Sequence, residues 1–104
     1  MMTPEQILLL AENNPAKLMQ VMKNMVDEDL TFAAEYLGSR CNSEEAKDCL
    51  IKLTKHKNAL VREGVVYGLS HYDDERVGET LKGLSNDPSP GVREAVEDAL
   101  EMFF

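Results

Sequence analysis

Apolar side chains recur along much of this chain at the three- and four-residue spacing of an amphipathic helix. One such stripe lies before residue 54 and consists of Ala46, Cys49, Leu50 and Leu53. The other lies before residue 85 and consists of Val77, Thr80, Leu81 and Leu84. Ser43 and Asp74 precede them, and both residue types are favoured helix N-caps because their side chains accept a backbone N–H. We expect a helix at each stripe that buries one face.

Each of these two helices is followed by another predicted helix. One begins near Asn58 and runs to about His71, and the other begins near Ser89 and runs to about Phe103. Their apolar stripes are Val61, Val65 and Leu69, and Val92, Val96 and Leu100. The turn before the last helix reads NDPSPG over 86–91, and Pro90 suits a first helical turn. The pattern therefore predicts an all-α chain of short helices joined by tight turns.

The chain repeats itself with a step of 31 residues. When 43–72 is laid over 74–103 without a gap, eight of the thirty positions are identical, including a Val-Arg-Glu triplet. A further step back carries Val61 to Leu30, and carries Leu50 and Leu53 to Met19 and Met22. We therefore expect a degenerate unit over 1–29, units over about 30–57 and 58–86, and a terminal half unit over 87–104.

The stretch DPSPGVREAVEDAL, from Asp87 to Leu100, resembles almost throughout the D-x-x-x-x-V-R-x-x-A-x-x-A-L signature of HEAT repeats, in the short form known from phycobilisome lyases. The preceding unit keeps Val61, Arg62 and Leu69 but has His56 at the place of the Asp. The resemblance covers 30–103 well and the first 29 residues by extrapolation. It implies a single-domain right-handed α-α superhelix of about three and a half helix pairs, with the second helix of each pair on the concave side.

Stacking of these pairs has a physical reason, because a pair with one apolar stripe per helix cannot cover itself and must lean on its neighbours. Small residues such as Ala33, Gly64, Gly68, Ala95 and Ala99 allow helices to approach closely. Each glycine inside a helix costs roughly 1 kcal/mol relative to alanine. We therefore expect the helix that holds Gly64 and Gly68 to be locally soft unless close packing compensates.

The net charge is −8, and most of the imbalance lies from Arg62 to Phe104. An acidic chain repels phosphate backbones and anionic lipid, so nucleic acid and membrane surfaces are expected not to be partners. The apolar run at 7–10 lies between Glu5 and Glu12 without a basic segment before it, which does not match a signal peptide or a membrane span. Cys41 and Cys49 form no CxxC pair. We expect a cytoplasmic protein with free thiols, of which Cys49 acts as a small hydrophobe.

Candidate chemistry is sparse. His56 and His71 fall on different helices without metal-ligand spacing, and no nucleophile elbow or phosphate loop occurs. The acidic runs at 27–29 and 73–75 are interpreted as helix caps rather than a calcium site. In the resembled family the arginine of the signature has a structural role, which implies the same for Arg62, Asp87 and Arg93. We therefore predict no enzyme activity, no cofactor and no metal.

What remains is surface. The resemblance places outward positions of the second helices on the concave face, and these candidate partner-binding residues are Lys17, Gln20, Lys23, Asp48, Ile51, Lys52, Lys55, Glu79 and Lys82. Four lysines, at 47, 52, 55 and 57, form a local basic patch that could seat an acidic peptide, although such a run is also typical of a solvated helix face. Met19, Met22 and Met25 are interpreted as core, with a docking groove as the alternative.

These features favour a non-catalytic scaffold or adaptor that binds a protein or peptide on its concave face. The alternative is an accessory or regulatory subunit of an enzyme complex, such as one of the tetrapyrrole or bilin lyase type. A solenoid that repairs DNA bases, like the HEAT-like alkylpurine glycosylases, is opposed by the charge. The apolar ends, Ile7 to Leu10 and Met102 to Phe104, either fold back over the outer layers or leave self-association open.

Overall fold

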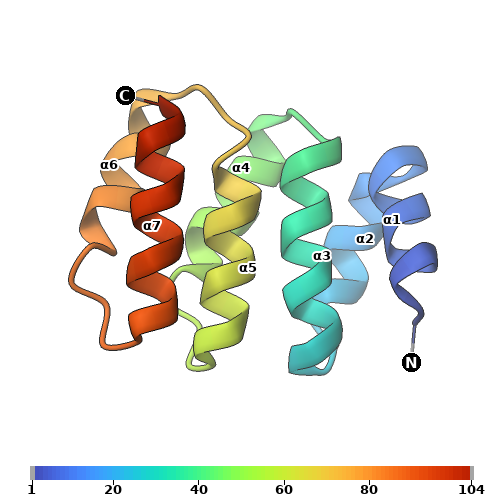
Figure 1. The fold of residues 1–104 in the computed structure, drawn as a ribbon. Helices are drawn as coiled ribbons and strands as arrows, with labels where there is room; N and C mark the ends of the chain where they lie inside the picture. Colours follow the sequence, from blue (N-terminus) through green and yellow to red (C-terminus); the bar gives the residue numbers. More distant parts are fainter. Residues whose placement is uncertain (1, 104) are drawn as a thin grey trace.

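Seven helices in two layers make up the computed structural model, which describes residues 2–103 and the side chains of 2–102 (Figure 1). One layer holds α1 (Pro4–Asn13), α3 (Asp27–Arg40), α5 (Ala59–Leu69) and α7 (Pro90–Phe103). The other holds α2 (Pro15–Met22), α4 (Glu44–Leu53) and α6 (Glu75–Gly83), which lie behind the first in Figure 1. The α-α solenoid of about three and a half pairs predicted from the repeat is confirmed.

Most of the described helices begin after a residue whose side chain accepts a backbone amide of the first turn. Ser43 accepts the Ala46 amide at 3.1 Å, and Asp74 accepts those of Arg76 and Val77, so both predicted N-caps are confirmed. α3 begins with the acidic run 27–29, whose negative charge favours a helix N-terminus. α7 begins at Pro90, as the turn cluster predicted. The unit boundaries stay predictions, and the first of them, between residues 29 and 30, falls inside α3.

The predicted stripes face the space between the two layers. Val61, Val65 and Leu69 of α5 and Val92 and Val96 of α7 are at most 1% exposed. α5 lies beside α7 in the same layer, and α3 contacts α5 on its other side (Figure 1). The Val61 and Val92 helices are therefore neighbours in one stack, as the 31-residue step requires.

Glycines bring α3 and α5 together backbone against backbone. A β carbon built on Gly38 would meet backbone atoms of Gly68, and one built on Gly68 would meet the carbonyl oxygen of Ala34. A β carbon on Gly64 would lie 2.5 Å from the carbonyl oxygen of Thr31. The close packing that the glycines of α5 needed is therefore present, and it offsets their low helix propensity.

The two ends differ in how far their apolar residues are covered. Ile7 is fully buried and Leu10 packs partly against the core, whereas Leu9 is 57% exposed. Met102 is 70% exposed, and the side chains of Phe103 and Phe104 lie outside the described residues. Ile7 thus folds back over its end of the stack, which was one of the two alternatives expected for the apolar ends. Leu9 and Met102 remain at the surface.

Candidate functional site

All nine candidate partner-binding residues lie on or next to the second layer of helices. Lys17, Gln20 and Lys23 belong to α2 or its C-terminal cap, Asp48, Ile51 and Lys52 to α4, and Glu79 and Lys82 to α6, while Lys55 lies in the turn after α4. All of them are exposed except Ile51, which is half-buried against the core. Whether this layer is the concave side and binds a partner stays a prediction.

A groove between α2 and α4 brings three of the nine together. Its volume is about 440 Å³, and we call it the α2–α4 groove; it is lined by Met19, Met22, Lys23, Leu30, Glu45, Asp48, Cys49, Lys52 and Leu53. Lys23, Asp48 and Lys52 come from the candidate set, and the other six candidates lie outside the groove. The floor is apolar and the rim is charged.

The two lysines of this rim are available to a ligand. Asp48 is already bound, since it accepts a hydrogen bond of 2.7 Å from Arg76. Lys23 and Lys52 form no ion pair with any residue that the structure describes. Burial raises the pKa of the Cys49 thiol, although the positive charges of Lys52 and Lys23 oppose the rise. Cys49 therefore stays protonated at neutral pH and contributes an apolar surface to the groove.

Met19 and Met22 pack in or against the core, as interpreted from the sequence, and they also line a groove, while docking there stays a prediction. Met22 is 5% exposed and belongs to the core, and Met19 and Met25 pack partly against that core. Met19 and Met22 also line the α2–α4 groove. Because a methionine side chain is unbranched and polarisable, it adapts to ligands of different shape. The docking alternative thus has a place in the fold beside the core interpretation.

The expected patch of four lysines is wrong in one member. Lys47 is buried on the other side of α4, where its ammonium group lies 3.0 Å from Asp74 and 2.6 Å from Glu44. It also lies over the ring of Tyr72, 5.9 Å from the centroid. Hydrogen bonds to Glu44 and Asp74 raise the pKa of Lys47. The bond between Lys47 and Asp74 also lowers the pKa of Asp74. Lys47 therefore ties α4 to the start of α6 and is not free to meet a ligand.

The two arginines of the signature both bond to Asp87, and Arg62 thereby links two neighbouring units. Arg62 donates from Nε and Nη2 to the two carboxylate oxygens of Asp87, at 2.9 and 3.0 Å, and from Nη1 to the carbonyls of His56 and Lys57. Arg93 donates to the Asp87 carbonyl at 2.6 Å and leaves the carboxylate to Arg62. Burial raises the pKa of Asp87, but the bonds from Arg62 and Ser89 outweigh it, and the pKa lies below its usual value.

His56 and members of both acidic runs have partners within the fold. His56 Nδ1 accepts the Asn58 amide at 3.0 Å, and its Nε2 lies 3.6 Å from Asp27. Within residues 2–103, no group of three or more His, Cys, Asp or Glu side chains is placed to hold a metal ion. Asp74, in the second acidic run, caps α6.

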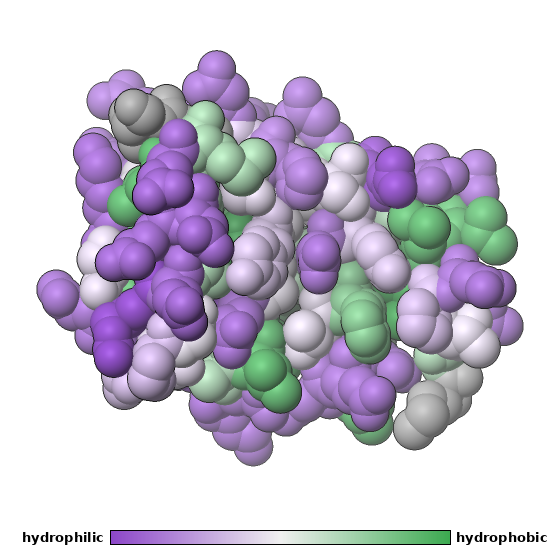
Figure 2. Space-filling view, in the orientation of Figure 1, coloured by the Kyte–Doolittle hydropathy of each residue, from purple (hydrophilic) through white to green (hydrophobic). Residues whose placement is uncertain are grey.

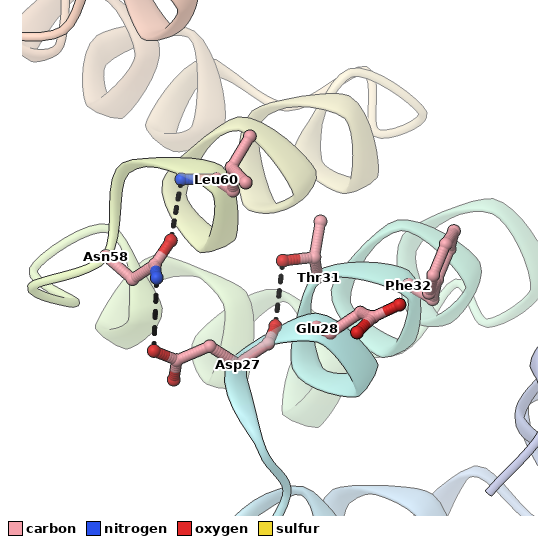
Figure 3. Close-up of a pocket in the computed structure, with 6 residues that line it drawn as sticks. All are labelled: Asp27, Glu28, Thr31, Phe32, Asn58 and Leu60. Carbon is pink, nitrogen blue, oxygen red and sulfur yellow. Dashed lines mark hydrogen bonds between the residues drawn. The ribbon is translucent and has the colours of Figure 1, made fainter.

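A second hollow, between the N-terminal ends of α3 and α5, was missed from the sequence. Its volume is about 490 Å³, and we call it the α3–α5 hollow; it is lined by Asp27, Glu28, Thr31, Phe32, Asn58 and Leu60 (Figure 3). The Asn58 side chain bridges the two helices, because it accepts the Leu60 amide at 2.8 Å and donates to Asp27 at 3.1 Å (Figure 3).

Two signals in the sequence could have found this hollow. Leu60 falls outside the stripe of Val61, Val65 and Leu69, so the helical period turns this large apolar side chain away from the core, and it is 63% exposed. Asp27 and Asn58 are 31 residues apart, one repeat, so their side chains occupy equivalent places in adjacent units. Together these positions mark an apolar spot beside an inter-repeat bond.

No helix among the described residues is long and apolar enough to cross a membrane. No curated protein and no solved structure matches the chain. The family model of HEAT repeats, by contrast, matches residues 15–101. This range includes residues 15–29 of the degenerate first unit as well as the later units. That match agrees with the two-layer stack, the inter-unit Arg62–Asp87 bonds and the 31-residue step. The chain is therefore a member of the HEAT repeat family.

Proposed function

We propose that this protein is a non-catalytic binding module that holds a segment of another protein in the α2–α4 groove. HEAT repeats are commonly protein-interaction scaffolds, and this chain belongs to that family. The observation that carries the proposal is an apolar groove of about 440 Å³ with two lysines on its rim that form no ion pair with any described residue. The groove occupies the layer of second helices, where the candidate residues gather.

The rim charges indicate an acidic partner with an apolar anchor. Lys23 and Lys52 come from different helices and stand on opposite walls of the groove, so a bound segment would meet both. Met19, Met22 and Leu53 supply the apolar contact, which contributes most of the affinity in buried anchors. The lysines contribute orientation and a faster encounter more than affinity. An amphipathic acidic helix or strand with one apolar edge fits these requirements.

The groove offers little for catalysis. Its lining holds one thiol and two carboxylates but no histidine that could act as a base toward the thiol. The pKa of Cys49 is raised, which is opposite to the shift of an activated nucleophile. Asp48 is engaged by Arg76. These features support binding without a reaction.

The test uses a fluorescent amphipathic peptide of about 15 residues, a length that can form a helix. One face of the peptide carries leucine and the other glutamate, and a twin carries lysine in place of each glutamate. We expect the acidic peptide to bind in fluorescence anisotropy, and the Lys23→Glu, Lys52→Glu double variant to weaken its binding at least about tenfold, or about 1.4 kcal/mol.

The matched control reverses the same amount of charge on the same layer but outside the groove. Lys17 and Lys57 are exposed and do not line the groove, so the Lys17→Glu, Lys57→Glu variant should keep most of the affinity. Equal losses in both double variants would mean that the peptide responds to overall charge, and the groove would not be the site. A Met19→Ala variant should also weaken binding, because it shortens the apolar floor.

The accessory-subunit hypothesis predicts a different result. If the chain serves a tetrapyrrole lyase complex, protein purified from its native host should carry visible absorbance from a coloured ligand. A colourless protein that captures acidic protein segments through Lys23 and Lys52 supports the scaffold. A purified protein with a bilin-like absorbance band would favour the alternative.

A further inference from the structure

The face opposite the α2–α4 groove carries apolar and acidic residues side by side. Figure 2 shows this face, where hydrophilic residues cover most of α7 and hydrophobic surface interrupts them near the N-terminal ends of α3 and α5. The α3–α5 hollow lies there, with the half-buried ring of Phe32 and the exposed Leu60 in its wall (Figure 3). Phe32 also stacks on Tyr36 one turn further along α3, with ring centroids 6.3 Å apart.

The outward stripe of α5 extends this surface beyond the hollow. Leu60, Glu63 and Tyr67 follow one another at helical spacing, so they point to the same side and span about 10 Å along the axis. Leu60 is 63% exposed and Tyr67 is 40% exposed. Two large apolar side chains thus stand in water on one stripe, separated by a carboxylate.

Carboxylates from three helices surround Tyr67. Burial raises the pKa of Tyr67, and the negative charges of Asp98, Glu63, Glu35 and Glu94 raise it further. These four belong to α3, α5 and α7, and every one of them acts on the same phenol ring. The surface around Tyr67 is therefore negative where α3, α5 and α7 lie side by side.

The arginines of α5 and α7 do not neutralise this surface. Arg62 is bound to the carboxylate of Asp87, and Arg93 donates to the backbone of the same residue. Arg40 of α3 lies 3.7 Å from Glu12 of α1. The cations of this layer are thus turned toward structural partners, which leaves the acidic groups around Tyr67 to an outside cation.

We propose that the α3–α5 hollow and the Tyr67 surface beside it bind a basic amphipathic segment of a second protein. An apolar side chain of that segment would fill the hollow against Phe32 and Leu60. Its lysine or arginine side chains would lie over the Tyr67 ring and between the carboxylates of α3 and α7, where charge attraction and cation–π contact act together. With the α2–α4 groove on the other layer, the protein would bridge partners of opposite charge.

A second copy of this chain fits the face poorly. Two copies meeting through it would place the carboxylates around Tyr67 against each other, and like charges across an interface cost several kcal/mol. The chain carries a net charge of −8, which adds to that repulsion. A basic partner relieves the same repulsion, so charge complementarity selects it.

The test uses the lysine–leucine peptide described above, with its glutamate twin as the reference. We expect the Lys23→Gln, Lys52→Gln protein, in which the α2–α4 groove is disabled, to bind the basic peptide more tightly than the acidic twin. A Leu60→Ser, Tyr67→Ser variant should weaken the basic peptide at least about tenfold. Both side chains are exposed, so circular dichroism should find the helical fold of this variant intact.

A charge-matched pair separates this site from the overall charge of the protein. Glu35→Gln with Glu94→Gln removes two carboxylates near Tyr67, whereas Glu75→Gln with Glu79→Gln removes two exposed carboxylates from α6 in the other layer. The first pair should weaken the basic peptide at least about threefold more than the second, and should flatten the salt dependence of binding.

Three outcomes would overturn the proposal. Equal effects of the two glutamine pairs would mean that the peptide responds only to the overall charge of the protein. An unchanged affinity in the Leu60→Ser, Tyr67→Ser variant would mean that the hollow is not part of the binding site. A dimer that light scattering detects without peptide, and that the Leu60→Ser variant does not form, would mean that a second copy of the chain occupies this face. Failure of the acidic peptide at the α2–α4 groove would leave this result untouched, because the variants and peptides are separate.

Discussion

Gly68 of α5 lies so close to Gly38 of α3 that a β carbon on either residue would collide with the backbone of the opposite helix. Such contact brings the backbones of the two helices together, at the cost of two glycines in helix interiors. The glycine pair is therefore a packing requirement of this layer and not a source of flexibility.

Replacement of Gly68 by alanine should destabilise the fold. The new methyl group would meet the carbonyl of Ala34, and relief requires α3 and α5 to separate, which costs about 1–3 kcal/mol or more in a packed core. Urea unfolding followed by circular dichroism would measure the loss in the free energy of unfolding. Gly83→Ala is the control, because Gly83 has open space around its Cα and should gain up to about 1 kcal/mol in a helix. A stabilised Gly68→Ala protein would contradict the packing described above.

Asp87→Asn should cost about 1.5–3 kcal/mol at neutral pH, since it removes the charge that Arg62 and Ser89 hold. The pKa of Asp87 in the fold lies below its ordinary value of 3.8, so its contribution to stability is complete above about pH 5. That contribution is lost as the pH falls through the lower, folded pKa.

The difference in unfolding free energy between the unaltered protein and Asp87→Asn should therefore shrink below about pH 4. Asp73→Asn serves as the control, because Asp73 is exposed and bonds to no residue among those described. The difference in unfolding free energy between the unaltered protein and Asp73→Asn should stay within about 0.5 kcal/mol at each pH. A difference for Asp87→Asn that grows on acidification would show that the pKa is not lowered by folding.

Tyr72→Phe should destabilise by about 1–2 kcal/mol. The Tyr72 hydroxyl donates to the Cys41 carbonyl at 2.6 Å across one repeat, and its removal leaves that carbonyl without the bond. Thermal and urea unfolding would both report the change. Tyr36→Phe is the matched control, because its hydroxyl bonds to no described residue, and it should be neutral within about 0.5 kcal/mol. Equal effects of the two substitutions would assign no stability to the Cys41 bond.

Salt should separate the charged and apolar parts of binding at the α2–α4 groove. At an ionic strength of about 1 M the Debye length is about 3 Å, so the contribution of Lys23 and Lys52 to affinity should fall away. The loss caused by Met19→Ala should persist, because apolar contact does not depend on screening. Anisotropy titrations at low and high salt would check this. A Met19→Ala effect that vanishes in high salt would mean that Met19 does not contact the peptide.

Much of the fold could be predicted from short stretches of the chain. Ser43 and Asp74 mark helix starts because caps act on amides within three residues, and Pro90 marks one because its ring fixes the φ angle of a first helical residue. The buried stripes follow from the 3.6-residue period, and the stacking follows from their repetition every 31 residues. The candidate site could be predicted only in part, because Lys23, Asp48 and Lys52 line the groove while the other six candidates lie elsewhere on the layer.

Local sequence determined the helices, their caps, their apolar faces and the order in which they stack, since each depends on residues a few positions apart or on the repeat itself. Tertiary structure alone decided that Lys47 faces Asp74, that Asp87 gives its carboxylate to Arg62 rather than Arg93, and that Asn58 bridges to Asp27. These contacts join residues 25 to 31 positions apart. Their partners are set by the rotation and spacing of neighbouring helices, which the packing of glycine and apolar side chains fixes only when the whole stack has formed.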